Sequence, residues 1–375
     1  MNDVNFVHEA SALSDWLYGA AMPLWLAHGI DWERRAFHES LDPESLVCGV
    51  DFRRLYVTAR QIYVFAQGEK AGVARASRAV TLGLDFLENR ARQADGGYAW
   101  RFAIDNAVTN PARDLYDLAF VLFGFANANR PERCHAAALQ LMDFIDRVLK
   151  DPSGGWQEAD PPRLPRRQNP HMHLLEAALA AYEAFGDSVF LEVADAVVGL
   201  AIAHFIDEDK GLCEYFDSRL TPMTDGAGHY VTEPGHHYEW AWLLARYGKL
   251  RKVTAEAARR LQSAATSLIR LADRNGLSSA ANAAIDEVMS DGTIVSGKAK
   301  LWPQTERLKA RLAWPGSASA PLSSAVEGLR AYIDGMSPGC WREQRDEDGN
   351  FIPQPMQASS LYHLTCAILE AKAHA

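Results

Sequence analysis

A stretch of ten residues, Glu233 to Trp242, places two histidines and a glutamate at the start of a predicted helix. Pro234 and Gly235 lead into this helix, and apolar residues follow its first turn. Because residues three apart share one face of a helix, His236 and Glu239 can contact each other, and the carboxylate then sets the tautomer or the charge of the imidazole. Such a pair suits proton transfer. The alternative is a helix start in which both side chains only satisfy free backbone groups.

The chain has 375 residues, of which 48% are hydrophobic, enough to bury the core of one large barrel or of two ordinary domains. Its net charge is −10, with 48 acidic and 38 basic residues, so neither nucleic acid nor an anionic membrane is an expected partner. The N-terminus lacks the basic and apolar regions of a signal peptide, and no later apolar run approaches the ~20 residues that span a bilayer. We therefore expect a cytoplasmic protein.

Helical periodicity predicts about twelve helices along the whole chain. They span residues 6 to 28, 52 to 68, 70 to 91, 112 to 129, 131 to 149, 169 to 185, 187 to 206, 234 to 248, 253 to 274, 301 to 313, 317 to 334 and 358 to 373. The odd-numbered helices are amphipathic, whereas the even-numbered ones are apolar nearly all round and should be buried on every side. This alternation predicts an all-α (α/α)₆ barrel, with six inner helices inside six outer ones, as a single domain over residues 1–375.

Each predicted inner helix also carries a polar or charged residue that interrupts its apolar surface. These residues are Arg60, Asp117, His173, Glu239, Glu306 and His363. They recur at intervals close to the length of one helical hairpin. Because the inner helices of such a barrel are parallel, we expect these side chains to gather at one end and to line a single cup. Long loops precede the inner helices, and loops of that length usually carry function.

Seven stretches of the chain resemble the N-acylglucosamine 2-epimerase superfamily. They are Arg60–Tyr63, Asp95–Tyr98, Asp114–Phe120, Gln168–Ala177, Glu233–Trp242, Leu301–Glu306 and Leu361–Leu364. The resemblance covers almost the whole chain and implies the (α/α)₆ barrel. It also implies a sugar isomerase or epimerase that removes the proton next to the carbonyl of an open-chain sugar and forms an enediol. Return of the proton to carbon 1 gives isomerisation, and return to the opposite face of carbon 2 gives epimerisation.

The resemblance further implies roles for individual residues. His236 and His363 would be the acid and base, in either order, and Glu239 would orient and tune His236. The implied substrate contacts are Arg60, Asn169, His173, Trp302, Gln304 and Glu306, with Tyr116 and Asp117 as further candidates. His171 and His173 point roughly 200° apart on a helix, so only one can face the cup, and the family pattern selects His173. His237 follows His236 directly and is expected to have a structural role.

Within the superfamily, the chain looks nearest to bacterial mannose isomerases. We therefore expect a monosaccharide substrate, with interconversion of D-mannose and D-fructose as the first prediction and 2-epimerisation of an N-acylglucosamine, mannose or cellobiose type as the alternative. No cofactor and no metal is expected, because the histidines and glutamates do not form a dense ligand cluster. The sequence leaves the oligomeric state open, with a homodimer as one option.

Three other interpretations remain open. A glycoside hydrolase would use two facing carboxylates from Asp117, Glu239 and Glu306, at about 5 to 9.5 Å. A sugar-binding or protein-binding module would keep the cup without turnover. Finally, Arg163, Arg166 and Arg167 in one loop would suit the phosphate or sulfonate of an anionic substrate, unless they are only solvated.

Overall fold

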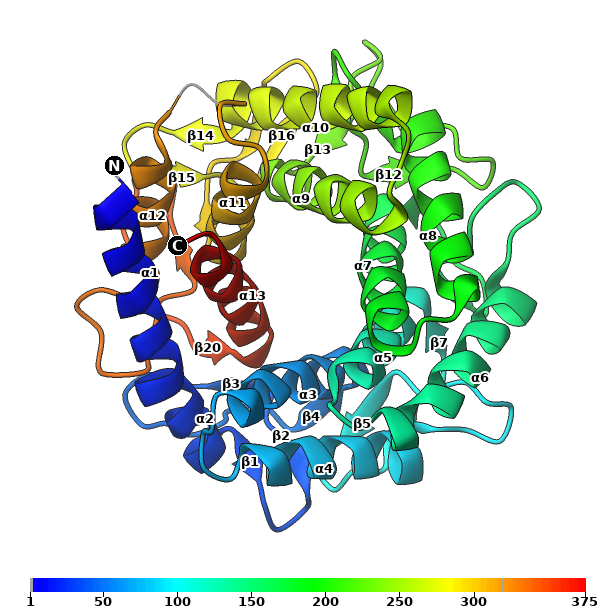
Figure 1. The fold of residues 1–375 in the computed structure, drawn as a ribbon, viewed down its shortest axis with the longest axis vertical. Helices are drawn as coiled ribbons and strands as arrows, with labels where there is room; N and C mark the ends of the chain where they lie inside the picture. Colours follow the sequence, from blue (N-terminus) through cyan, green and yellow to red (C-terminus); the bar gives the residue numbers. More distant parts are fainter. Residues whose placement is uncertain (1–2, 318–319) are drawn as a thin grey trace.

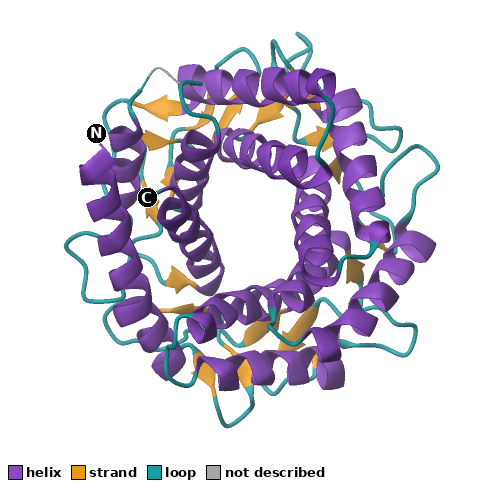
Figure 2. Cartoon of the chain, viewed as in Figure 1, coloured by secondary structure: helices purple, strands orange, loops and turns teal. Residues whose placement is uncertain are grey.

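The protein forms two concentric rings of helices, one inside the other (Figures 1 and 2). The computed structural model describes residues 3–317 and 320–375. The inner ring consists of α3 (Leu55–Lys70), α5 (Leu115–Asn127), α7 (Gln168–Phe185), α9 (Pro234–Arg251), α11 (Trp302–Ala313) and α13 (Ala358–His374). Each of these coincides with a predicted inner helix to within a few residues.

The outer ring contains several helices that continue through a π-helical turn. It consists of α1 (Asp3–Trp16) with η1 (Leu17–Ala21) and α2 (Met22–His28), α4 (Ala76–Phe86) with η2 (Leu87–Ala91), α6 (Pro131–Leu149), α8 (Ser188–Leu200) with η3 (Ala201–Phe205), α10 (Ala255–Gly276) and α12 (Leu322–Arg330). The described residues thus form six outer and six inner rods, and the prediction of an (α/α)₆ barrel is confirmed.

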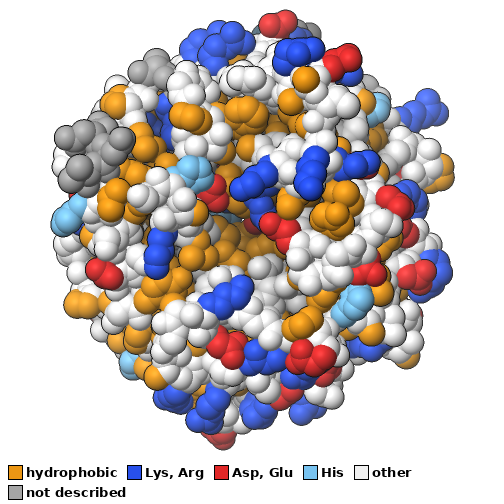
Figure 3. Space-filling model, viewed as in Figure 1, with side chains coloured by type: hydrophobic (Ala, Val, Ile, Leu, Met, Phe, Trp, Pro, Cys, Tyr) orange, Lys and Arg blue, Asp and Glu red, His pale blue; other side chains and the backbone are white. Residues whose placement is uncertain are grey.

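Burial explains why the two rings differ in sequence. In α5 every side chain from Leu118 to Phe125 is buried, because α3 and α7 flank this helix and α6 covers it from outside. The outer helix α10 buries one face, which includes Leu261, Leu268 and Ile269, and exposes the other. A hollow remains at the centre of the inner ring and opens on the face shown in Figure 3.

Short antiparallel strands lie in the connections between helices. Two sheets have three strands: β4 (Phe52–Arg54), β5 (Arg101–Ala103) and β6 (Val108–Asn110), and β13 (Val231–Thr232), β16 (Glu287–Met289) and β17 (Ile294–Ser296). The remaining strands pair as β1 (Ile30–Asp31) with β2 (Ala36–Phe37), β3 (Ser40–Leu41) with β20 (Met356–Gln357), β7 (Arg113–Asp114) with β8 (Ala159–Asp160), β9 (Arg166–Arg167) with β12 (Tyr215–Phe216), β10 (Ile206–Asp207) with β11 (Gly211–Leu212), β14 (Leu277–Ser278) with β15 (Ala283–Ala284), and β18 (Ala299–Lys300) with β19 (Gln344–Arg345). Several of these pairs connect successive loops, so the strands stabilise the end of the barrel at which the inner helices begin.

Buried carboxylates hold the starts of five inner helices. Each accepts a backbone N–H at or just before the helix start: Glu39 from Arg54 (2.6 Å), Glu158 from Arg167 (2.6 Å), Glu214 from Glu233 (3.3 Å), Asp286 from Lys300 (3.0 Å) and Glu343 from Gln357 (2.6 Å). Free N–H groups at helix starts need such acceptors. The sixth helix, α5, is capped by Asp114, the residue before its start, whose carboxylate accepts from the N–H of Tyr116 at 3.0 Å. The long loops therefore position the same end of every inner helix.

The ring closes between its first and last inner helices. The amide nitrogen of Gln61 on α3 donates to the carbonyl of Ala358, the first residue of α13, at 2.8 Å. Helix α1 packs on α13 from the outer ring, so the two ends of the described chain lie close together (Figure 1). The last helix is thus an integral part of the wall.

One segment of the outer ring, Ser188–Phe205, is long and apolar enough to cross a membrane by length and composition alone. Its mean hydropathy is 1.7 over 18 residues, which corrects the statement that no apolar run approaches this length. In the fold, 44% of the segment is buried, and α8 packs against α7.

Candidate active site

A cavity of about 250 Å³ lies where the inner helices begin. We call it the histidine cavity. It is lined by Tyr56, Arg60, Tyr116, Asn169, His173, Glu233, His236, Glu239, Trp302, Ser359, Ser360 and His363. All six inner helices or their first residues contribute. Most of the predicted site residues are in this set, and the three that are absent from it are Asp117, Gln304 and Glu306.

His236 is bound to a carboxylate that the sequence did not suggest. Its Nδ1 lies 3.0 Å from both carboxylate oxygens of Glu214, which comes from the loop after β11, and 3.7 Å from Glu233. Burial by itself would lower the pKa of this imidazole, but the negative charges of Glu214 and Glu233 outweigh it and raise the pKa to about 10. His236 is therefore an imidazolium at neutral pH.

The predicted contact between His236 and Glu239 is not formed. Glu239 lies one turn further along α9, and its Oε1 lies 3.9 Å from Nδ1 of His173 instead. Burial raises the pKa of Glu239 well above its usual range, and the charge of Glu306 adds to this shift. Glu214 takes the place assigned to Glu239 because the loop brings it over the first turn of α9. The recurrence of a carboxylate before each inner helix is the sequence signal that would have found it.

His363 has a different protonation state. Its Nδ1 donates to Oε1 of Glu306 at 2.9 Å, so the Nε2 lone pair is the free basic site of the neutral ring. Burial lowers the pKa of His363 to about 4, and the positive charge of Arg60 adds to this effect, although Glu306 acts against it. The ring is an unprotonated base at neutral pH.

The indole of Trp302 lies between the two imidazoles. Its ring centroid is 5.0 Å from that of His236 and 5.7 Å from that of His363, and both interplanar angles are 39°. The indole approaches the backbone of α9 so closely that a Cβ atom on Gly235 would lie 2.4 Å from it. Gly235 is thus required for the packing that separates the acidic and basic rings.

Arg60 supplies a positive charge at the side of the cavity. Its guanidinium lies 4.0 Å from the ring centroid of Phe120, and its Nη2 donates to the hydroxyl of Tyr116 at 2.8 Å. Asn169 completes the contacts of His236, because its amide lies 3.1 Å from Nε2. A charged His236 carries hydrogens on both ring nitrogens, so the amide oxygen of Asn169 is the atom that suits this contact.

The other histidines divide as predicted. His173 faces the cavity, and its Nδ1 lies 3.2 Å from Oε2 of Glu176. Burial lowers the pKa of His173 to about 4. His171 points elsewhere, where its Nε2 accepts from the N–H of Trp156 at 3.1 Å. His237 accepts from the N–H of Leu212 at 2.8 Å, so its contact is with the backbone.

Three predicted substrate contacts lie outside the cavity wall. The Gln304 amide accepts from the N–H of Ala284 at 2.8 Å and donates to its carbonyl at 2.9 Å, which fixes the chain before α11. Asp117 accepts the N–H of Tyr56 at 2.8 Å and so joins α5 to α3. Glu306 stands behind His363. These polar side chains are buried because they satisfy other groups of the barrel.

The three loop arginines are also engaged within the fold. Arg163 pairs with Asp114, and Arg167 pairs with Glu158 at 2.8 Å. Arg166 is fully buried and donates to the carbonyl of Trp156 at 3.1 Å. This loop therefore presents no unpaired guanidinium among the described residues for an anionic substrate.

Three groups of side chains bring ligand-type atoms within 4.8 Å of one another: His173, Glu176 and Glu239; Glu214, Glu233 and His236; and Glu239, Glu306 and His363. In each group the histidine Nδ1 hydrogen-bonds a carboxylate or lies beside one. That arrangement orients a ring for proton transfer as well as for metal binding, so the expectation of a metal-free site stays a prediction.

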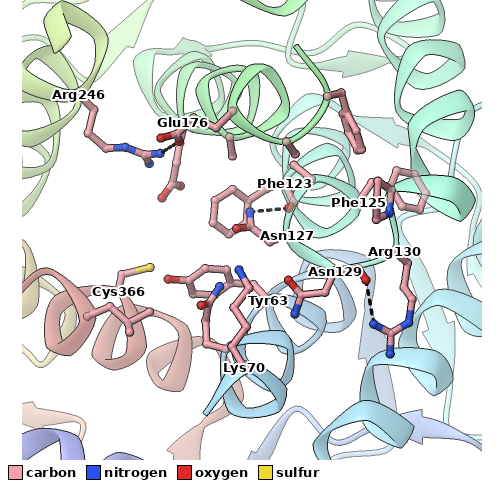
Figure 4. Close-up of a pocket in the computed structure, with 18 of the residues that line it drawn as sticks. Tyr63, Lys70, Phe123, Phe125, Asn127, Asn129, Arg130, Glu176, Arg246 and Cys366 are labelled. Carbon is pink, nitrogen blue, oxygen red and sulfur yellow. Dashed lines mark hydrogen bonds and ion pairs between the residues drawn. The ribbon is translucent and has the colours of Figure 1, made fainter. Parts of the chain in front are cut away.

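A second cavity of about 560 Å³ lies at the opposite end of the inner ring, where α3, α5, α7, α9 and α13 end (Figure 4). Its walls include Tyr63, Phe123 and Trp242, and most of its charged groups are paired. Arg246 binds Glu183, and Arg130 binds Glu69. We call it the second cavity.

An (α/α)₆ barrel with one charged and one neutral histidine in a cavity of sugar size is typical of enzymes that move protons on carbohydrates. Residues 36–367 match the sequence model of the N-acylglucosamine 2-epimerase family, and the chain belongs to that family. It is 34% identical over 380 residues to a mannose-6-phosphate isomerase of Rhizobium meliloti (strain 1021), and the match covers 96% of each chain. The predicted family and the prediction of a sugar-isomerising enzyme are confirmed.

Solved structures share the fold at lower identity. The crystal structure of a D-mannose isomerase superposes with a TM-score of 0.85 at 19% identity, covering 97% of each chain. A cellobiose 2-epimerase from Spirochaeta thermophila DSM 6192 superposes with a TM-score of 0.83 at 20% identity, covering 99% of this chain and 98% of that one.

Proposed function

We propose that this enzyme interconverts an aldose of the mannose type and the corresponding ketose, with His363 as the base and His236 as the acid. The observation that carries the proposal is the pair of imidazoles on either side of Trp302, one neutral and one charged at neutral pH. Two titratable groups whose environments separate their pKa values are suited to base and acid roles in one reaction.

The reaction begins with the cyclic sugar. His236 donates a proton to the ring oxygen and takes up the proton that the anomeric hydroxyl loses as the ring opens, so it is charged again. The negative charges of Glu214 and Glu233 favour this charged form. His363 then uses Nε2 to remove the proton from carbon 2. The resulting enediolate places negative charge on the oxygens of carbons 1 and 2, where Arg60 donates hydrogen bonds. The proton held by His363 exchanges with solvent, and His363 then delivers a proton to carbon 1. His236 protonates the oxygen of carbon 1 and takes the hydroxyl proton from the oxygen of carbon 2, which gives the ketose.

The dimensions of the histidine cavity support a monosaccharide substrate. Its volume of about 250 Å³ is below the roughly 300–1,000 Å³ typical of pockets for drug-sized ligands. Trp302 offers a flat apolar face to a sugar ring. The Rhizobium relative is named for a phosphorylated mannose, so mannose and mannose 6-phosphate are both tested as substrates.

A 2-epimerase is the second candidate. It is favoured by the position of His236 across Trp302 from His363, which allows proton return to the opposite face of carbon 2. A glycoside hydrolase receives less support, because Glu239 and Glu306 are buried and Glu306 is bound to His363 and Lys309.

Deuterium incorporation distinguishes these functions. The protein is incubated in D₂O with mannose, fructose, glucose, mannose 6-phosphate and N-acetylglucosamine, and each sugar is followed by NMR. Isomerisation places deuterium on carbon 1 of the ketose, whereas epimerisation places it on carbon 2 of a new aldose. Folded protein that exchanges no deuterium into any of these sugars contradicts the proposal. A parallel assay after chelation, with metal analysis of the protein, tests the metal-free site.

A further inference from the structure

We propose that Lys309 is a positioning residue that keeps His363 in its unprotonated form by neutralising Glu306. This proposal deepens the proposed function, since it concerns the base of that reaction. Sequence analysis gave Lys309 no role, and this lysine is fully buried inside the barrel.

The three side chains form a continuous chain of contacts. Lys309 lies one turn after Glu306 on α11, and its Nζ is 2.6 Å from Oε2 of Glu306. The other oxygen of the same carboxylate, Oε1, accepts from Nδ1 of His363 at 2.9 Å. Both Lys309 and Glu306 have no exposed side-chain surface. Each oxygen of Glu306 therefore has its own partner, one cationic and one imidazole.

The ammonium position is fixed from a second side. Nζ of Lys309 lies 3.7 Å from the centroid of the Trp242 ring, at a distance typical of a cation–π contact. Burial of a lysine is costly unless its charge is compensated. The side chain is thus held in place by a carboxylate and an indole, both inside the barrel.

The effect of Lys309 follows from comparison with His236. His236 faces two carboxylates, Glu214 and Glu233, neither of which contacts a buried lysine in the described part of the chain, and its pKa is raised to about 10. Glu306 makes the same kind of contact to His363, but the adjacent ammonium cancels most of its charge. Burial then dominates and lowers the pKa of His363, with Arg60 and Lys309 acting in the same direction. Lys309 and Arg60 thus act together against Glu306 at His363, whereas two carboxylates act together at His236.

Other titratable groups around His363 come from the remaining walls. They are Arg60 from α3, His173 from α7, Glu239 from α9, and Tyr362 beside His363 on α13. Of these, Glu239 is the one carboxylate, and burial with neighbouring acids raises its pKa well above the usual range. Lys309 therefore acts on the main negative charge that His363 meets.

The test replaces Lys309 by methionine, which keeps the length of the side chain and removes the charge. In Lys309→Met the uncompensated Glu306 favours the imidazolium, so the acidic limb of the kcat/KM profile should move up by about one to two pH units. Activity lost near pH 6 should return at higher pH. The pKa of His363, measured from the ring ¹⁵N shifts of histidine-labelled protein, should rise by the same amount.

Two further variants separate charge from structure. Arg311→Met removes a buried charge from the same helix, but Arg311 binds Asp273 at 2.9 Å, outside the site, so the pH profile should not move. The double variant Glu306→Gln/Lys309→Met restores neutrality and keeps an acceptor for His363, so the ring titration should return toward that of the unmodified protein. This double variant buries no charge at either position, so it can be studied even if Lys309→Met does not fold. A rise in the pKa of His363 in the double variant would contradict the proposal.

An unchanged acidic limb and an unchanged His363 titration in folded Lys309→Met would overturn the role of Lys309. The NMR titration requires no substrate. It therefore tests Lys309 even where every sugar in the panel proves inactive, and failure of the proposed function is distinguished from failure of this inference.

Discussion

The two ends of the inner ring show what turns a cavity into a candidate active site. Both ends are hollow, and the second cavity is the larger, at about 560 Å³ against about 250 Å³. In the second cavity Arg246 and Arg130 are paired with carboxylates, and the rest of the wall is a mixture of aromatic, apolar and polar side chains. In the histidine cavity, His236 and His363 are driven to opposite protonation states. Unequal titration, and not volume, marks the histidine cavity as the candidate active site.

The ends are not fully independent, because Glu176 belongs to both. It lines the second cavity, and its Oε2 accepts from Tyr362 at 2.5 Å and from His173. His173 in turn lines the histidine cavity. The following variants test how far the separation between the ends holds.

Loss of either central histidine should give the largest effect. His363→Asn and His236→Asn remove the base and the acid, so kcat should fall by about 10²- to 10⁴-fold, the usual contribution of a positioned acid or base. Steady-state kinetics on the active sugar measures the loss, and circular dichroism checks the fold. Turnover close to that of the unmodified enzyme in either folded variant would remove that histidine from the mechanism.

Glu214→Gln should weaken the acid without removing it. The pKa of His236, raised to about 10 by Glu214 and Glu233, should fall toward its usual range, so the alkaline limb of kcat/KM should move to lower pH. A raised pKa in the folded state stabilises the fold below the unfolded pKa, and this contribution is lost as pH rises through about 10. The part of the stability deficit that comes from His236 should therefore be full near pH 6 and should disappear above pH 10, where only the loss at the backbone N–H of Glu233 remains.

Glu158→Gln is the matched control for that variant. Glu158 accepts the backbone N–H of Arg167 before α7, as Glu214 does before α9, but it contacts Arg167 and no histidine. Denaturant titrations at several pH values should show a loss of stability without a change in the alkaline limb. Equal shifts of that limb in both variants would mean that helix capping, and not the imidazole, controls it.

Gly235→Ala should have a moderate effect. The added Cβ would lie 2.4 Å from the Trp302 ring, which must move and widen the gap between the two imidazoles. Overpacking of this kind costs about 1–3 kcal/mol, so we expect kcat/KM to fall by roughly tenfold or more. Gly199→Ala is the control, since a Cβ there meets nothing within 4 Å. Full activity in Gly235→Ala would show that the spacing set by Trp302 is unimportant.

Arg246→Met in the second cavity should have the smallest effect. It breaks a partly exposed ion pair with Glu183, which is worth at most about 1 kcal/mol of stability. We expect kcat/KM within about twofold of the unmodified enzyme. A tenfold loss in a folded variant would show that Glu176 transmits changes from the second cavity to the reactive end.

The helical barrel could be predicted from sequence because its cause is local. Apolar residues recur with the helix period, and helices that are apolar all round must be inside. Most residues of the histidine cavity could also be predicted, since the family motifs lie in the first turns of these helices. Glu214 could not be placed in the same way, because it comes from a loop and meets His236 only after folding.

Two other polar residues were predicted to contact substrate, but the fold uses them for a different purpose. Gln304 and Asp117 lie on inner helices at positions that suggest substrate contact, yet their side chains bind backbone groups of Ala284 and Tyr56. Helical spacing gives the direction of a side chain about the helix axis. It does not give the unsatisfied backbone group that a neighbouring loop brings within reach.

The position of His363 on the last helix has a consequence for biosynthesis. A ribosome makes the chain from its N-terminus, so the base emerges after every other wall of the barrel. It reaches the cavity only when α13 docks between α11 and α3 and Gln61 binds Ala358. Contacts between such distant parts of a chain form late because closing a long loop costs entropy. A truncated or half-folded chain therefore lacks the proposed base in the cavity, so activity would report that the ring has closed.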